Sequence, residues 1–195
     1  LQALKIIKDK GLFFQCLLVG DGINKKNNEL MILLEKNEIR DRVLLMGPQD
    51  DIYNVMNAFD LHILSSISES FGNVLAEAMA CGIPCITTDI GMPREIVGDT
   101  GWVVPIKNPN ELAKTILKVI DIMDDTISWK LRKKSCRKRI SNNFTDDIMA
   151  LKYLTHWQNL FLIQAKTKND NKGPENILQC EGGTYLDRQY EYNKN

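Results

Sequence analysis

The chain has 195 residues, 44% of them hydrophobic, which is enough to bury a core and favours one domain with extensions over two equal domains. Lysine plus arginine and aspartate plus glutamate both number 25, so the formal net charge is zero, which argues against a protein drawn to nucleic acid by bulk charge. The five cysteines lie apart without a Cys-x-x-Cys pair, a distribution that argues against zinc or redox chemistry and favours the cytoplasm.

The first 59 residues predict helices that alternate with strands. Residues 1–11 form an amphipathic pattern that stops at Gly11, and the apolar run from Phe13 to Val19 predicts a buried parallel strand. Gly20-Asp21-Gly22 predicts a tight turn at its end. The elements expected next are a helix over 28–39, a strand over 42–46 that stops at Gly47-Pro48, and a brief helix over 51–59.

The same alternation continues to residue 122. Strands are predicted at 61–64, 85–88 and 102–105, and helices from Gly72 to Ala80, around 94–97, and from Pro109 to Ile122 with Asn108 or Asn110 as the cap. At least five alternations with short loops predict an α/β fold, a doubly wound parallel sheet of the Rossmann type with right-handed crossovers.

Ligands of such sheets bind at the carboxyl ends of the strands. The loop 65–72 lies at one of these ends, where five polar residues occupy six positions, and it leads into a helix through Phe71-Gly72-Asn73. A helix that begins directly after a strand presents unpaired backbone N–H groups and the positive end of its dipole. The loop and helix therefore predict an anion site, with phosphate as the expected guest.

The composition changes after residue 122. The segment KLRKKSCRKRI has seven basic residues in eleven and is interpreted as the solvated face of a helix, with contact to an anionic membrane surface as the alternative. A further helix is expected over 148–163 with Thr145 as its cap. We therefore expect a Rossmann-like domain over 1–122, a helical extension over 123–165 and a disordered tail over 166–195.

Residues 1–163 resemble the C-terminal domain of the family-four retaining glycosyltransferases, enzymes with two facing Rossmann-like domains that use nucleotide-activated sugars. The resemblance is carried by the run from Glu69 to Glu77, ESFGNVLAE, in which seven residues separate the paired glutamates, and by AMACGIP directly after it. The later segment DIGMPREIVGDTGWVVP is similar to versions in bacterial surface-polysaccharide enzymes.

The resemblance implies roles for these residues. Glu69 would hold the hydroxyls of the transferred sugar as the catalytic-site residue, and Glu77 would accept the ribose hydroxyls of the donor. The remaining donor-binding residues are Phe71, Gly72 for close approach, the backbone amides of Asn73, Val74 and Leu75 for the diphosphate, and Met46 and Gly47 near the base. The reaction implied is sugar transfer with retention to a glycan or lipid-linked acceptor in polysaccharide or lipopolysaccharide assembly, without a metal or other cofactor, in the cytoplasm or at the inner face of the membrane.

Plainer interpretations accompany these roles. Glu77 could be an exposed helix-forming residue, Glu69 a solvated loop acid, and Phe71 a packing residue rather than a substrate contact. His62 and His156 stand among apolar neighbours and are interpreted as core or surface residues rather than catalysts.

The sequence departs from the family pattern at its start. The resemblance implies a preceding central strand, a Gly-Arg…Lys-Gly segment for the diphosphate and an N-terminal acceptor domain, none of which lies in this chain. Without the central strand we expect a gap between the strands at 14–19 and 61–64. Without the other two segments we expect little activity from the chain alone. Alternatives are a non-catalytic binding module, and a sugar-nucleotide epimerase or phosphorylase with the same two-domain plan.

Overall fold

The computed structural model describes the backbone of residues 1–170 and the side chains of residues 1–163. The chain divides into two compact units, one of residues Leu1–Met149 and one that begins at Ala150. The first unit holds all the strands of the described residues, and the second is described here by the continuation of a single helix.

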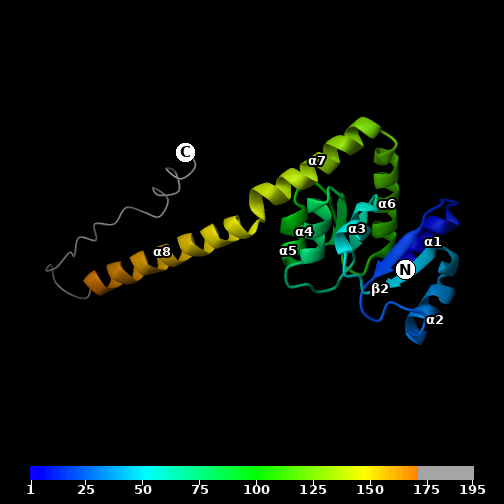
Figure 1. The fold of residues 1–195 in the computed structure, drawn as a ribbon, viewed down its shortest axis with the longest axis horizontal. Coiled ribbons are helices and arrows are strands. Elements are labelled where there is room, and N and C mark those ends of the chain that lie inside the picture. The colour runs from blue at the N-terminus through cyan, green and yellow to red at the C-terminus, as the bar shows by residue number, and fades with distance from the viewer. Residues whose placement is uncertain (171–195) are drawn as a thin grey trace. The chain divides into compact units, whose positions relative to one another are not determined.

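Helices and strands alternate through the first unit (Figure 1). Their bounds are α1 (Gln2–Asp9), β1 (Cys16–Val19), α2 (Asn28–Lys36), the 3-10 turn η1 (Arg40–Arg42), β2 (Val43–Gly47), α3 (Ile52–Asn57), β3 (His62–Leu64), α4 (Asn73–Ala80), β4 (Cys85–Thr88), α5 (Gly91–Val97), β5 (Trp102–Val104), α6 (Pro109–Met123) and α7 (Thr126–Asn143). The last helix, α8 (Asp146–Asp170), continues into the second unit, and residues 171–195 of the predicted tail lie outside the described residues.

All strand pairs in the described residues are parallel, which confirms the predicted α/β class. The strands form two sheets: β1 pairs with β2, and β4 lies between β3 and β5. Because β1 and β3 do not pair with each other, the predicted gap between them is confirmed. The central position of β4 explains why all four of its side chains are buried, while those of β1 and β3 are half-buried.

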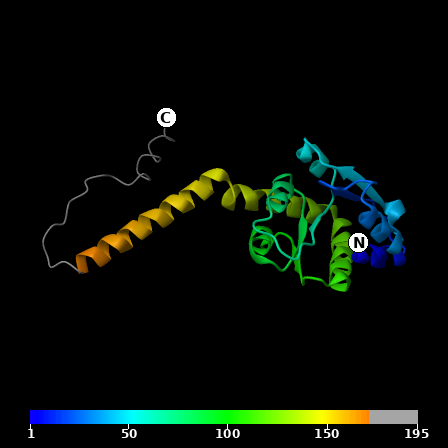
Figure 2. The ribbon, with the colours of Figure 1, turned by 90° about the horizontal axis from the view of Figure 1, so that it is seen from below.

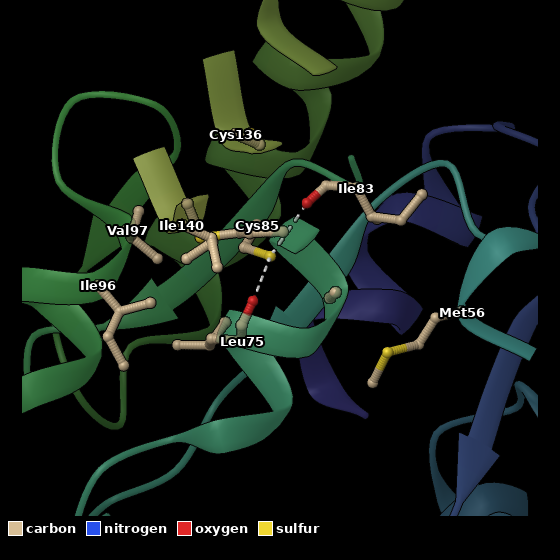
Figure 3. Close-up of a cluster of buried hydrophobic side chains, with 10 residues drawn as sticks. Met56, Leu75, Ile83, Cys85, Ile96, Val97, Cys136 and Ile140 are labelled. Atoms are coloured by element: carbon tan, nitrogen blue, oxygen red, sulfur yellow. Dashed lines mark hydrogen bonds between the residues drawn. The ribbon is translucent and has the colours of Figure 1, made fainter. Parts of the chain in front are cut away.

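Successive residues of β4 supply cores on opposite faces of their sheet, as the pleat of a strand requires. Cys85 lies in the core beneath α4, where its thiol donates to the carbonyl oxygen of Ile83 at 3.3 Å and lies 4.0 Å from that of Leu75 (Figure 3). Ile86 belongs to the core on the other side, together with Ile7 of α1 and Ile116 of α6. Figures 1 and 2 both show α6 beside the N-terminal helix that completes this layer.

Element ends differ from the predictions where side chains find another partner. The predicted strand from Phe13 begins only at Cys16, because Phe13 is 84% exposed and its ring lies under the Arg42 guanidinium at 4.6 Å. The helix expected over 28–39 ends at Lys36, since Glu38 takes a positive φ of 55°. For α6 the cap is Asn108, whose side chain accepts from the Glu111 amide at 3.0 Å.

The arginines of α7 bind backbone carbonyls at the ends of other elements. Arg137 donates to the carbonyl of Cys81 at the C-terminus of α4 at 2.8 Å, and Arg139 donates to the carbonyls of Ile96, at 2.7 Å, and Glu95 in the last turn of α5. Arg132 donates to Thr100 at 3.0 Å and lies over the Trp102 ring. The interpretation of this segment as a solvated face is therefore wrong for Arg132 and Arg139, which are half-buried. It holds for Arg137, which is exposed although it binds a carbonyl, and for the exposed lysines Lys130, Lys134 and Lys138.

His62 lies at the start of β3, away from the carboxyl end where ligands of such sheets bind. Its ring stacks on Phe59 at 6.4 Å, its Nε2 is buried without a hydrogen-bond partner in the described residues, and burial lowers the pKa of His62 to about 4. This surrounding agrees with the interpretation of His62 as a core histidine.

We expect His62 to make the fold sensitive to acid. The unfolded chain protonates this imidazole near its ordinary pKa of 6.5 and the folded chain only near 4, so the unfolded state binds more protons in that window. Stability is therefore full above the unfolded pKa and is lost as the pH falls, by on the order of 1 to 2 kcal/mol between about pH 7 and pH 5. Urea unfolding at both pH values should show a smaller loss for His62→Phe, whereas His156→Phe should behave like the wild type; equal losses in all three would contradict the assignment.

Candidate functional site

The candidate site lies where β3 ends and the loop 65–72 enters α4. Gly72 is the N-cap residue of α4 and has φ 91°, in the left-handed region that favours glycine. A Cβ at this position would lie 3.2 Å from Pro93 of α5 and 3.6 Å from Leu64 of β3. The positive φ and the short contact to Pro93 therefore both favour glycine at the entrance of α4.

Two backbone N–H groups at the start of α4 have no acceptor among the described residues, those of Asn73 and Val74. Gly72 provides no side-chain cap. The third amide of the predicted trio, Leu75, already donates to the Gly72 carbonyl at 2.9 Å. An anion placed here would meet the N–H groups of Asn73 and Val74 together with the positive end of the helix dipole.

Glu77 lies on the same face of α4 as Asn73, one turn further along. Glu77 is half-buried there, and the side chains of a helix generally lean toward its N-terminus. Glu69 is exposed in the loop, where its carboxylate accepts from the Ser70 amide at 3.0 Å. The paired glutamates thus flank the start of α4, Glu77 on the helix and Glu69 on the loop before it.

Phe71 is 38% exposed directly before Gly72, so its ring is only partly covered by the protein. Val74 is half-buried and Leu75 is fully buried in the core beneath α4. The side chain of Leu75 therefore belongs to the core. The exposed or half-buried side chains of the predicted set, which a ligand could contact, are those of Glu69, Phe71, Asn73, Val74 and Glu77.

Thr88, at the carboxyl end of β4, fixes the loop before α4. Its side chain is 4% exposed, and its hydroxyl donates to the carbonyl oxygen of Ser66 at 2.6 Å. Sequence reasoning missed this role, although a threonine at the last position of a buried parallel strand is a signal that could have drawn attention to it.

Arg94 is the only cation in α5, the helix whose Pro93 lies against Gly72. Its Nη1 lies 2.7 and 2.8 Å from the two carboxylate oxygens of Asp89. The positive charge nearest in sequence to the entrance of α4 is therefore paired with an acid, and the helix N-terminus supplies the positive field at that entrance.

Met46 and Gly47 lie at the carboxyl end of β2, in the two-stranded sheet. Gly47 has φ 66°, its amide donates to Ile23 at 3.0 Å, and its carbonyl accepts from Gly20 at 2.9 Å. Met46 is 37% exposed. The structure thus ties Gly47 to the loop after β1 and places both residues in a different sheet from the α4 group.

In the part of the chain that the structure describes, no cluster of three or more histidine, cysteine, aspartate or glutamate side chains is arranged to hold a metal ion. Within the same residues, no helix has the length and apolar character required to cross a bilayer.

Comparison with known proteins gives one consistent family. Residues 1–121 match the family model described as glycosyl transferases group 1. The chain is 34% identical over 141 residues to N-acetyl-alpha-D-glucosaminyl L-malate synthase of Bacillus anthracis, a match that covers 71% of this chain and 36% of that protein. It is 30% identical over 135 residues to the UDP-Gal:alpha-D-GlcNAc-diphosphoundecaprenol alpha-1,3-galactosyltransferase of Escherichia coli, covering 66% of this chain and 32% of that protein.

Among solved structures, the chain is similar to Anabaena Alr3699/HepE in complex with UDP-glucose, with a TM-score of 0.63 and 26% identity over 74% of this chain and 41% of that one. The chain therefore spans about a third to two-fifths of the length of these matched proteins.

Proposed function

Because the chain belongs to the group 1 family of glycosyl transferases, we propose that it is the donor-binding part of a retaining enzyme that transfers sugar from a nucleotide-diphosphate sugar. The observation that carries this proposal is the entrance of α4, where the free amides of Asn73 and Val74 lie between Glu69 and Glu77. The complex of the Anabaena protein with UDP-glucose supports this class of donor.

The proposed binding mode gives each group at the entrance a separate task. The donor diphosphate accepts from the two free amides, and Gly72 lets it approach the backbone. Glu77 accepts the ribose hydroxyls because a carboxylate can take two donors at once, and Glu69 holds the sugar. Phe71 covers the donor from the loop, and Met46 and Gly47 lie toward the base.

In the reaction, the fixed amides and helix dipole stabilise the charge that develops on the leaving diphosphate, which is an electrostatic contribution of the preorganised kind. We propose that no metal or other cofactor takes part. The transferred sugar keeps its anomeric configuration in this proposal, as the resemblance of the ESFGNVLAE motif implies.

The acceptor in this proposal is a glycan or a lipid-linked glycan in polysaccharide or lipopolysaccharide assembly on the cytoplasmic side. The similarity to a galactosyltransferase whose name specifies a diphosphoundecaprenol acceptor supports it. Acceptor binding and turnover are proposed for the whole protein, and the 195-residue chain alone is expected to turn over poorly.

Substitution of Glu77 tests the proposal. We expect Glu77→Ala to weaken donor binding about ten- to a hundredfold, the effect of losing hydrogen bonds to a charged group, with Glu77→Gln intermediate. Donor affinity is measured by calorimetry with UDP-sugars and other nucleotide sugars, and turnover by sugar transfer in the whole protein.

The matched control is Glu35→Ala, which removes an exposed glutamate of α2 and should leave affinity unchanged. Unchanged donor affinity and turnover in Glu77→Ala would overturn the assignment. Product analysis separates the alternatives, because an epimerase releases an isomerised free sugar nucleotide and a phosphorylase consumes inorganic phosphate.

A further inference from the structure

A second candidate site lies at the opposite end of α4 from the donor entrance. There α7 crosses the C-terminus of α4 (Figure 1) and encloses a hollow of about 370 Å³. Its lining consists of Asn57, Cys81, Ile83, Lys130, Lys133, Lys134 and Arg137. Since α4 has eight residues, roughly 12 Å of helix separates this hollow from the entrance of the same helix.

The hollow is strongly cationic. Lys130, Lys133, Lys134 and Arg137 follow one another at intervals of three, one and three residues, which places all four along a single stripe of α7. The sequence of α7 contains no acidic residue, and none of the three lysines has an ion pair or hydrogen bond within the described residues. No carboxylate is among the described residues that line the hollow, so its lysines are available to an external anion.

Arg137 both binds the end of α4 and contributes hydrogen-bond donors to the hollow. One of its nitrogens binds the Cys81 carbonyl at 2.8 Å, which fixes the guanidinium at the wall of the hollow. The planar guanidinium has five N–H donors, so others remain to meet a ligand. A fixed guanidinium beside three unpaired ammonium groups suits the several oxygens of a phosphate group.

Beside the lysine stripe, α7 exposes two large apolar side chains one turn apart, Ile127 at 73% and Leu131 at 61%. They lie on the side of α7 opposite the buried Cys136, next to Lys134 and Lys138. Two apolar side chains of this size can enter the headgroup region of a membrane while the neighbouring lysines meet its anionic groups. This pair therefore favours a phospholipid over a free phosphate as the source of the anion.

We infer that the hollow under α7 binds the phosphate headgroup of anionic phospholipids and, with Ile127 and Leu131, holds the protein on the membrane surface. This places a lipid contact on a face separate from the donor entrance. It is independent of the proposed glycosyl transfer, because the hollow lies at the far end of α4 from the residues assigned to the donor.

The test is flotation of the 195-residue chain with phosphatidylcholine vesicles, with and without phosphatidylglycerol. We expect binding only to the anionic vesicles, and a ten- to hundredfold weaker partition for the triple variant Lys130→Gln, Lys133→Gln, Lys134→Gln. Ile127→Ser with Leu131→Ser should also weaken binding. Thermal unfolding by circular dichroism verifies that each variant remains folded. We expect this because none of the substituted side chains is fully buried.

The matched control is the triple variant Lys25→Gln, Lys26→Gln, Lys36→Gln, which removes the same charge from exposed lysines elsewhere and should bind like the wild type. Equal weakening in both triple variants would mean a net-charge effect and would overturn the inference, as would absence of binding by the wild type. Calorimetric binding of inorganic phosphate without vesicle binding would overturn the lipid assignment. Donor affinity should stay unchanged in the hollow variant, so failure of this inference is distinct from failure of the proposed function.

Discussion

Gly101→Ala is expected to lower the free energy of unfolding by about 3 kcal/mol or more, measured by urea denaturation. Gly101 directly precedes β5 and lies against β4. A Cβ there would overlap the backbone carbonyl oxygen of Cys85 and would lie 2.6 Å from the Cγ1 of Val97. Because Cys85 is part of the central strand, the obstacle is backbone that can move only if the sheet moves.

Gly11→Ala is the matched control, since Gly11 has a positive φ of 80° but no heavy atom within 4 Å of the added Cβ. Gly11→Ala should lower the free energy of unfolding by about 1 kcal/mol, because it places a side chain on a left-handed backbone without a steric overlap. If Gly101→Ala were no more destabilising than Gly11→Ala, the proposed overlap with β4 would be wrong.

Arg139→Ala is expected to destabilise the fold by about 2 to 3 kcal/mol, because it removes a charged donor from two carbonyls in the last turn of α5. The side chain also lies 3.8 Å from Asp99 and 5.8 Å from the Phe144 ring. Lys138→Ala, at an exposed neighbouring position of α7, should change stability by less than about 0.5 kcal/mol. Denaturant unfolding of both variants gives the comparison.

The same arginine explains Gly98, whose added Cβ would lie closer than 3.0 Å to the Arg139 guanidinium. We therefore expect Gly98→Ala to be less destabilising in the Arg139→Ala background than in the wild type, and a double-mutant cycle measures this coupling. Additive effects of the two substitutions would show that guanidinium and glycine do not share the space at the end of α5.

The sequence correctly predicted those features of the fold that depend on residues close together in the chain. The boundaries of β4 match the predicted strand, and α4 begins directly after the predicted glycine, because apolar runs and a glycine at a helix start are local signals. What escaped prediction depends on residues far apart in the sequence. Arg137 reaches a carbonyl 56 residues away and Thr88 one 22 residues away, and neither pairing leaves a periodic trace in the sequence.

The same limit applies to the candidate site: its local motif was predicted, and its backbone hydrogen bonds were not. The motif located Gly72, Glu69 and Glu77 at one loop and helix, and the structure brings them to the same entrance. The motif could not show that Leu75 uses its amide within the helix, because that depends on the φ of 91° at Gly72 and the tight first turn that follows.

The contacts at the two ends of α4 also bear on the proposed binding of the donor. At its start, Leu75 packs in the core beneath the helix, and at its end the Cys81 carbonyl is bound by Arg137. A helix restrained at both termini has little freedom to slide along its axis or to tilt. An arriving diphosphate would thus meet amides already aimed at it, and little of its binding free energy would be spent on reorganising the protein.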